Sequence, residues 1–145
     1  MNKNILSFLA FLFAATSAVY LYYIHHLIAT NPILIGIQVA AVLLMIWARV
    51  TFGIRSFHAT ASTSEGKLVT NGPYHYWRHP IYASIIYFVW AGQIQGSNLL
   101  SIGITLLVTA ALFTRILLEE HFLKQKYPEY TEYMKQAKRI IPYVI

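Results

Sequence analysis

The sequence contains no cysteine and no aspartate, and charged residues make up only 11% of its 145 residues. The absence of cysteine excludes disulfides, thiolate nucleophiles and thiolate metal sites. Five glutamates are the only acidic residues, against eleven lysines and arginines. So little charge argues against an ordinary soluble domain, in which about a quarter of the residues are charged.

Hydrophobic residues make up 57% of the chain and gather in four apolar runs, at residues 5–24, 33–50, 81–93 and 99–118. A helix needs about 20 apolar residues to cross a bilayer, so the third run is short for a span. We predict an all-α integral membrane protein with about four transmembrane helices as two hairpins. A cleaved signal peptide is the alternative for the first run, but its length and the tyrosines that close it favour an anchor.

The basic residues indicate the topology. They occur at Lys3, in the segment between the hairpins and in the C-terminal tail, whereas the connections at residues 25–31 and 95–98 have no lysine or arginine. Because basic segments stay in the cytoplasm, we predict that both termini and the central segment are cytoplasmic. The net charge of +6 fits anionic membrane lipids better than nucleic acid.

The C-terminal tail is predicted to form an amphipathic helix. Its hydrophobic residues recur at spacings of three and four across residues 127–140. Glutamates lie in the first turn, and Lys138 and Arg139 lie in the last turn, as the helix dipole favours. Pro142 would end this helix.

Polar and aromatic groups concentrate at residues 66–82, between the hairpins. Pro80 suits the first turn of a helix, and the N–H groups of that helix start would favour a bound carboxylate. The aromatic side chains could face a flat ring or a cation, although an interfacial aromatic belt is the simpler interpretation. They are Tyr74, Tyr76, Trp77 and Tyr82.

Two pairs of ionisable residues lie four positions apart. Arg115 and Glu119 share one face of the fourth helix, either as functional groups or as a snorkelling arginine beside an interfacial carboxylate. His75 and His79 could share a metal ion in a helix. However, Pro80 disfavours helical geometry at His79 and no third ligand is near in sequence, so we predict no metal site.

Several motifs in the second half of the chain resemble one family. They are L-V-T-N-G-P-Y at residues 68–74, R-H-P-I-Y at 78–82, E-E-H-F-L at 119–123 and a tyrosine-rich tail ending R-I-I-P at 139–142. In this order they resemble the isoprenylcysteine carboxyl methyltransferase family, which is related to the membrane phospholipid methyltransferases. The combination of R-H-P-x-Y with a downstream E-E at the end of a membrane helix is more specific than either motif alone.

The resemblance implies one membrane domain over residues 1–145 that uses S-adenosyl-L-methionine without a Rossmann fold, with a cofactor-binding part at about 59–142. Arg115 would be the catalytic, substrate-side arginine, and Glu119 would face the cofactor ammonium. Both Glu119 and His79 should then reach one small molecule. The cofactor-binding residues would be Gly66, Lys67, Leu68, Val69, Tyr74, His79, Pro80, Ile81, Tyr82 and Glu119.

The implied methyl acceptor is lipophilic, with the carboxylate of an isoprenylcysteine-like substrate as the first choice. A carboxylate needs no general base, and Arg115 would orient it. A phospholipid amine or a small thiol is the alternative acceptor, and an amine would need a base such as Glu119, Glu120 or His79. A non-catalytic four-span membrane protein is the alternative of another class. Ser84 stands where the family often has glycine, and this difference bears on the fine geometry of the site.

Overall fold

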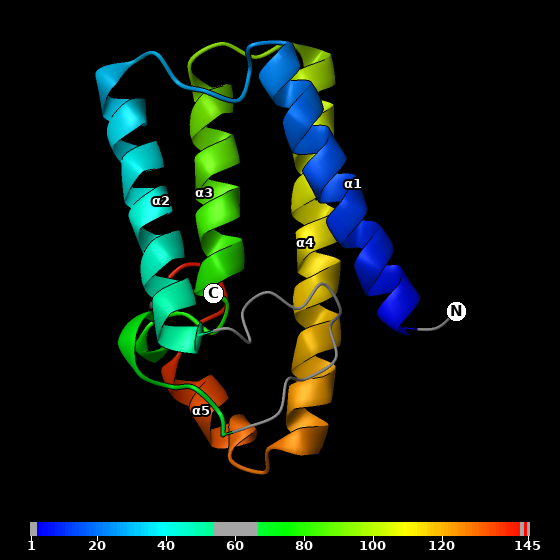
Figure 1. Ribbon diagram of the computed structural model, residues 1–145, viewed down its shortest axis with the longest axis vertical. Coiled ribbons are helices and arrows are strands. Elements are labelled where there is room, and N and C mark those ends of the chain that lie inside the picture. The colour runs from blue at the N-terminus through cyan, green and yellow to red at the C-terminus, as the bar shows by residue number, and fades with distance from the viewer. Residues whose placement is uncertain (1–2, 54–66, 143, 145) are drawn as a thin grey trace.

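The computed structural model describes residues 3–53, 67–142 and 144 of the chain. Within these ranges the elements are helices and no strand is present, so the expected all-α class is confirmed. Four long helices run along the long axis of the molecule, and two short ones lie at one end (Figure 1). The helices are α1 (Lys3–Tyr23), α2 (Pro32–Phe52), the 3-10 helix η2 (Gly72–His75), α3 (Pro80–Ile94), α4 (Leu99–Lys126) and α5 (Tyr130–Gln136).

The helix starts follow from local chemistry. The Asn31 side chain accepts a hydrogen bond from the Ile33 N–H at 3.0 Å, and Pro32 occupies the first helical position of α2. At the start of α4, Asn98 and Ser101 form a reciprocal capping box, in which each side chain accepts from the backbone N–H of the other. These caps satisfy backbone donors that the helices themselves leave unpaired.

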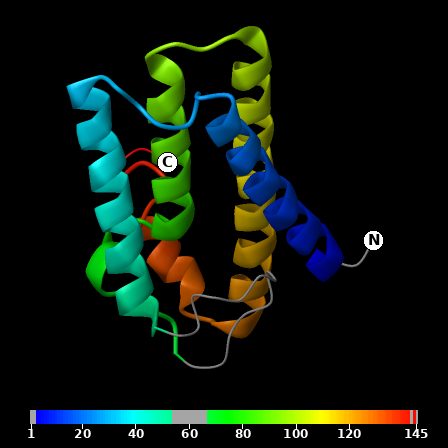
Figure 2. The same ribbon diagram turned by 45° about the horizontal axis from the view of Figure 1, so that its top comes forward.

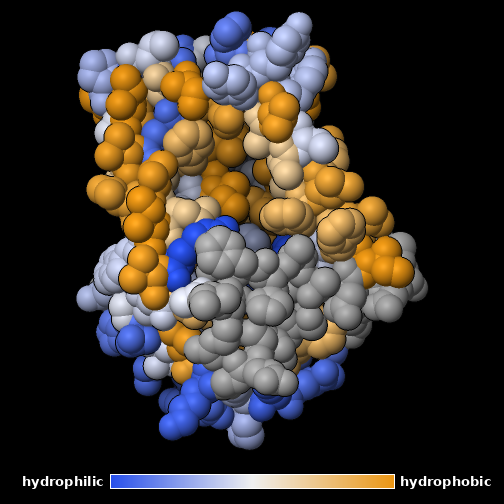
Figure 3. Space-filling view, in the orientation of Figure 1, coloured by the Kyte–Doolittle hydropathy of each residue, from blue (hydrophilic) through white to orange (hydrophobic). Residues whose placement is uncertain are grey.

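Three helices, α1, α2 and α4, are long and apolar enough to cross a membrane, and α3 is a shorter apolar helix of 15 residues. Their outward faces carry many exposed large hydrophobic side chains, such as Phe8, Leu12, Leu43 and Leu107. Figure 3 shows these hydrophobic side chains as a band between more hydrophilic ends. A water-soluble monomer rarely exposes so large an apolar surface, so the chain is an integral membrane protein.

The closest packing is between the two hairpins rather than within them. Helix α1 packs mainly against α4, and α2 packs mainly against α3. The connection between α1 and α2 therefore has to cross the end of α3, as Figures 1 and 2 show. Gly92 permits this crossing, because a Cβ atom there would lie only 2.3 Å from the Leu27 carbonyl oxygen.

One end of the bundle holds this crossing, and we call it the loop end. The opposite end holds η2, α5 and the C-terminal turns of α4, and we call it the charged end. Residues 67–79 and the described part of the tail lie together at the charged end. The connections at residues 24–31 and 95–98 lie together at the loop end. The two ends thus have different chemistry.

The predicted tail helix is too long at both ends. Helix α4 continues to Lys126, and α5 begins only at Tyr130 and ends at Gln136. At Ala137 the chain leaves the helix with an extended backbone, and residues 138–139 pair with residues 76–79. The Arg78 N–H donates to the Lys138 carbonyl at 2.6 Å, and the Lys138 N–H donates to the Tyr76 carbonyl at 3.2 Å. These tertiary hydrogen bonds replace the intrahelical ones that the spacing of hydrophobic residues had predicted.

Candidate functional site

Ionisable side chains from three elements meet at the charged end. The start of α3 supplies Arg78, His79 and Tyr82, and the last turns of α4 supply Arg115, Glu119 and Glu120. The tail supplies Arg139. Arg115, His79 and Glu120 are each at least 95% buried. Burying so many charged groups is costly unless they pair with one another.

His79 lies between the two glutamates. Its Nδ1 is 3.6 Å from Glu119 Oε2, and its Nε2 is 3.5 Å from Glu120 Oε1. Burial opposes protonation of this imidazole, but the two carboxylates outweigh burial and raise the pKa of His79 above its ordinary value. Nε2 is buried and makes no hydrogen bond within the described structure. The expected approach of His79 to Glu119 is therefore present.

Glu119 is the accessible carboxylate of the pair. Its side chain is 22% exposed, whereas that of Arg115 is 2% exposed. The Tyr82 hydroxyl donates to Glu119, and the Arg115 Nε donates to the Tyr82 oxygen at 3.1 Å. A second nitrogen of Arg115 lies 3.6 Å from Glu119 Oε1. Arg115 and Tyr82 therefore hold Glu119 at Oε1, while His79 lies beside Oε2 and the side chain remains partly exposed.

Glu120 is instead enclosed by cations. Arg78 Nε donates to Glu120 Oε1 at 3.0 Å, and Arg139 donates to both carboxylate oxygens at 2.8–3.1 Å. Arg78 also donates to the carbonyls of Met134 and Ala137, both at 2.9 Å. The consecutive residues of the E-E motif thus differ, one being partly open and the other fully paired.

Helix α1 also reaches the site, which the sequence did not indicate. The Ser7 carbonyl accepts a hydrogen bond from Arg115 at 2.7 Å, and the guanidinium carbon of Arg115 lies 5.6 Å from the centroid of the Phe11 ring. The Ser7 hydroxyl is fully buried and has no hydrogen-bond partner among the described residues. A serine inside an apolar run was the only signal, and it is a weak one.

The other residues expected at the site lie around this cluster. Gly66 falls outside the described residues. Lys67 is exposed, and Leu68 packs against the buried tyrosines of α5. Tyr74 is buried beside Phe52 with ring centroids 5.5 Å apart, and this burial raises the pKa of its hydroxyl above the ordinary range. Pro80 is the first residue of α3, and Val69 and Ile81 are half-buried.

His75, which we considered with His79 as a metal ligand, is exposed in η2. Among the residues that the structure describes, no group of three or more histidine and acidic side chains is arranged to hold a metal ion.

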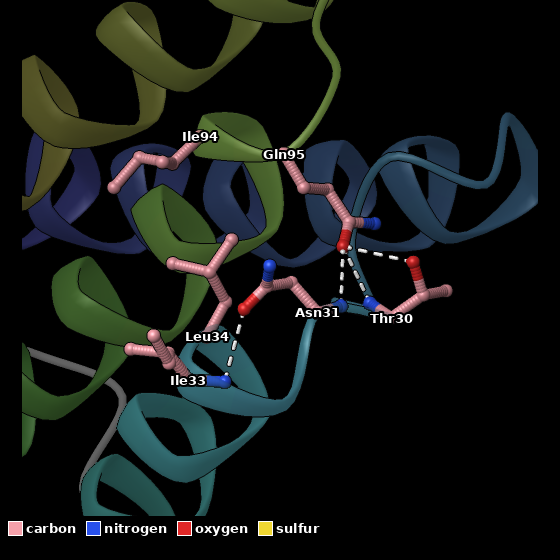
Figure 4. Close-up of a pocket in the computed structure, with 6 residues that line it drawn as sticks. All are labelled: Thr30, Asn31, Ile33, Leu34, Ile94 and Gln95. Atoms are coloured by element: carbon pink, nitrogen blue, oxygen red, sulfur yellow. Dashed lines mark hydrogen bonds between the residues drawn. The ribbon is translucent and has the colours of Figure 1, made fainter.

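A shallow depression lies at the opposite, loop end of the molecule (Figure 4). It is lined by Thr30, Asn31, Ile33, Leu34, Ile94 and Gln95. The Gln95 side-chain oxygen accepts from the N–H groups of both Thr30 and Asn31 and from the Thr30 hydroxyl. These polar groups are hydrogen-bonded to one another and link the two connections. The depression therefore has fewer polar groups available for a ligand than the charged end has.

A model of a known protein family matches much of the chain. Residues 26–130 match the model of the phospholipid methyltransferase family. This match covers more than half of the chain, and the chain therefore belongs to the phospholipid methyltransferase family. Helix α1 and the residues beyond 130 lie outside the matched region.

Particular relatives are isoprenylcysteine methyltransferases by name. The chain is 35% identical over 80 residues to protein-S-isoprenylcysteine O-methyltransferase B of Arabidopsis thaliana, covering 54% of this chain and 41% of that protein. It is 34% identical over 82 residues to the probable protein-S-isoprenylcysteine O-methyltransferase of Oryza sativa subsp. japonica, covering 55% and 43%. The chain thus matches less than half the length of these relatives. No solved structure matches it significantly.

Proposed function

We propose that this chain is an S-adenosyl-L-methionine-dependent methyltransferase with a lipophilic acceptor, first among them the carboxylate of an isoprenylcysteine-like substrate. One observation carries the proposal. The partly exposed Glu119 carboxylate lies 3.6 Å from His79, at the start of α3, inside a membrane protein of this family. The site would face the cytoplasm and would be formed within a single domain.

The residues at the charged end fit the cofactor. The His79 side chain does not cap α3, and the first hydrogen bond of this helix is Ala83 N–H to the His79 carbonyl. The N–H groups of Ile81 and Tyr82 therefore precede that bond and would hold the cofactor carboxylate. Glu119 would hold its ammonium group. The aromatic ring of Tyr82 would face its cationic sulfur.

The remaining expected contacts are proposed by position. Residues 67–69 lead into η2, where Tyr74 is fixed by a hydrogen bond from the Tyr133 hydroxyl to its carbonyl at 2.6 Å. Gly66 would also contact the cofactor by its place in the motif. Residues 67–69 and Tyr74 would then line the cofactor on the side away from α4, together with Pro80. This assignment rests on the family motif rather than on a bound molecule.

When bound, the cofactor supplies an electrophilic methyl group on a positively charged sulfur. The chain's own contribution is to position the acceptor and to exclude water, which strengthens electrostatic interactions within the site. Helix α1 covers Arg115 through Ser7 and Phe11, so its guanidinium lies out of water. We propose that the positive charge of Arg115 orients the acceptor.

The charge balance favours a carboxylate acceptor over an amine. Arg78, Arg115 and Arg139 carry three positive charges, while Glu119 and Glu120 carry two negative charges, which leaves a net charge of +1 even with His79 neutral. Excess positive charge in a buried cluster attracts an anion. Each glutamate is also paired with an arginine, so neither is an uncommitted general base for an amine.

A labelled-methyl assay tests this proposal. The purified protein in detergent or nanodiscs is incubated with methyl-labelled S-adenosyl-L-methionine and, separately, a prenylcysteine analogue, phosphatidylethanolamine and a small thiol. We expect base-labile methyl ester on the prenylcysteine analogue. Methylated phosphatidylethanolamine would instead establish the phospholipid alternative, which the family match favours. Absence of cofactor binding in calorimetric titration would refute the enzyme and favour a non-catalytic membrane protein.

A further inference from the structure

Glu120 connects the three parts of the charged end. Its carboxylate, 3% exposed, comes from α4 and contacts Arg78 and His79 at the start of α3 and Arg139 from the tail. The backbone of residues 138–139 is hydrogen-bonded to residues 76–79, including His79 N–H to the Arg139 carbonyl at 3.3 Å. Both Arg139 and its segment lie outside the region matched by the family model.

The placement of Glu120 has a geometric consequence for His79. The imidazole has Glu120 at Nε2 and Glu119 at Nδ1, so the two carboxylates act on opposite edges of one ring. Moving Glu120 would allow the ring to turn, and the edge that faces Glu119 would move with it. Glu119 is 22% exposed and would meet the cofactor, whereas Glu120 is too enclosed to do so.

We propose that Glu120 is a positioning residue that fixes the His79 ring against Glu119, and that the tail segment 137–140 belongs to the working site because Arg139 holds Glu120 in place. The predicted effect on cofactor binding rests on the proposed function. The predicted effect on the His79 ring does not. The two can therefore be tested separately.

The first test is titration of His79 by NMR in ¹⁵N-histidine-labelled protein, with Glu120→Gln and Arg139→Gln. The ionisable groups next to His79 are Glu119 and Glu120 of α4 and Tyr82 of α3. Arg78, Arg115 and Arg139 contact these two glutamates. Loss of the Glu120 charge should lower the pKa of His79 by about 1 or more. Because Arg139 holds Glu120, Arg139→Gln should release this carboxylate and also lower the pKa of His79, by less than Glu120→Gln does. If Arg139 acted through its charge alone, its loss would instead raise the pKa of His79, and that result would overturn the part of the proposal that concerns Arg139.

The second test is calorimetric titration with S-adenosyl-L-methionine. Glu120→Gln should weaken binding by about tenfold, and in the His79→Gln background the same substitution should have little further effect. The matched control is Glu132→Gln, which removes an exposed ion pair with Lys135 in the same tail. It should leave cofactor affinity and the His79 titration unchanged.

The outcomes separate the two ideas. If the wild-type chain binds no cofactor but His79 responds to both substitutions as described, the positioning stands and the proposed function fails. If Glu120→Gln lowers only the thermal unfolding midpoint and leaves His79 and cofactor binding unchanged, Glu120 is merely structural and the inference is overturned. If Glu120→Gln does not fold, Arg139→Gln decides, because it retains the pair between Arg78 and Glu120.

Discussion

The two ends of the helix bundle are held together by different chemistry. At the loop end, neutral amides join the connections: Gln38 accepts from the Ala29 N–H and donates to the carbonyls of Leu27 and Phe88. At the charged end, arginines and glutamates form a buried network around His79. Neutral hydrogen bonds suffice to hold loops in place, whereas buried charges are costly to maintain. This difference supports the proposal that the charged end carries the function, while the loop end contributes mainly to stability.

The largest effect should come from breaking the loop end. Gln38→Leu removes partners from three backbone groups, at a side chain that is 5% exposed. We expect the free energy of unfolding to fall by about 3 kcal/mol, because buried polar groups would be left unpaired. Unfolding in detergent, followed by tryptophan fluorescence, measures this change. Cofactor affinity of the folded fraction should stay the same, and a lost affinity would contradict the separation of the two ends.

A somewhat smaller effect should come from breaking the charged end at its open carboxylate. Glu119→Ala should weaken S-adenosyl-L-methionine binding by about 30-fold, the loss of a charged hydrogen bond of about 2 kcal/mol. Calorimetric titration measures it. Glu129→Ala, on an exposed tail residue, is the matched control. Equal affinities for Glu119→Ala and the wild type would remove Glu119 from the cofactor site.

The stability that His79 contributes at the charged end should depend on pH. The pKa of His79 is raised in the folded protein, so its pairing with the carboxylates stabilises the fold fully below its ordinary value of about 6.5. This contribution is lost as the pH rises through the raised value. The difference in unfolding free energy between the wild type and His79→Gln should therefore shrink from pH 6 upwards. A difference that grew with pH would show that His79 is buried in its neutral form.

The smallest effect should come from a substitution that touches neither hydrogen-bond network. Gly103 lies inside α4, and a Cβ atom there would meet nothing within 4 Å. Gly103→Ala should stabilise the helix by about 0.5 kcal/mol, since alanine loses less backbone freedom on folding. Cofactor binding should remain at the wild-type level. A destabilised Gly103→Ala protein would indicate that this face of α4 packs against another surface in the membrane.

Much of the fold was readable from the sequence because its signals are local. The apolar runs, Pro32, Pro80 and the asparagine caps set the helix starts within a residue or two. The end of the tail could not be predicted, because residues 138–139 pair with backbone partners about 60 residues away. The spacing of the hydrophobic residues alone favoured a helix there, but backbone hydrogen bonds to the earlier segment form instead.

The site divides in the same way. The motifs brought His79 and Glu119 together correctly, and the structure places them 3.6 Å apart. Ser7 had no such signal, and the R-I-I-P motif that begins at Arg139 did not indicate that this residue pairs with Glu120. Ser7 acts through its backbone carbonyl, which any residue type carries, and Arg139 resembles every other basic residue of the tail until Glu120 is seen beside it.

The pairing of residues 76–79 with residues 138–139 also sets an order of events during synthesis. The ribosome makes all four long helices before it reaches Arg139, so they can enter the bilayer and pack while Arg78 and Glu120 still lack this partner. The charged network closes only when the tail emerges and settles along the earlier segment. A chain truncated before residue 138 and released should therefore be inserted in the membrane and yet unable to close this network.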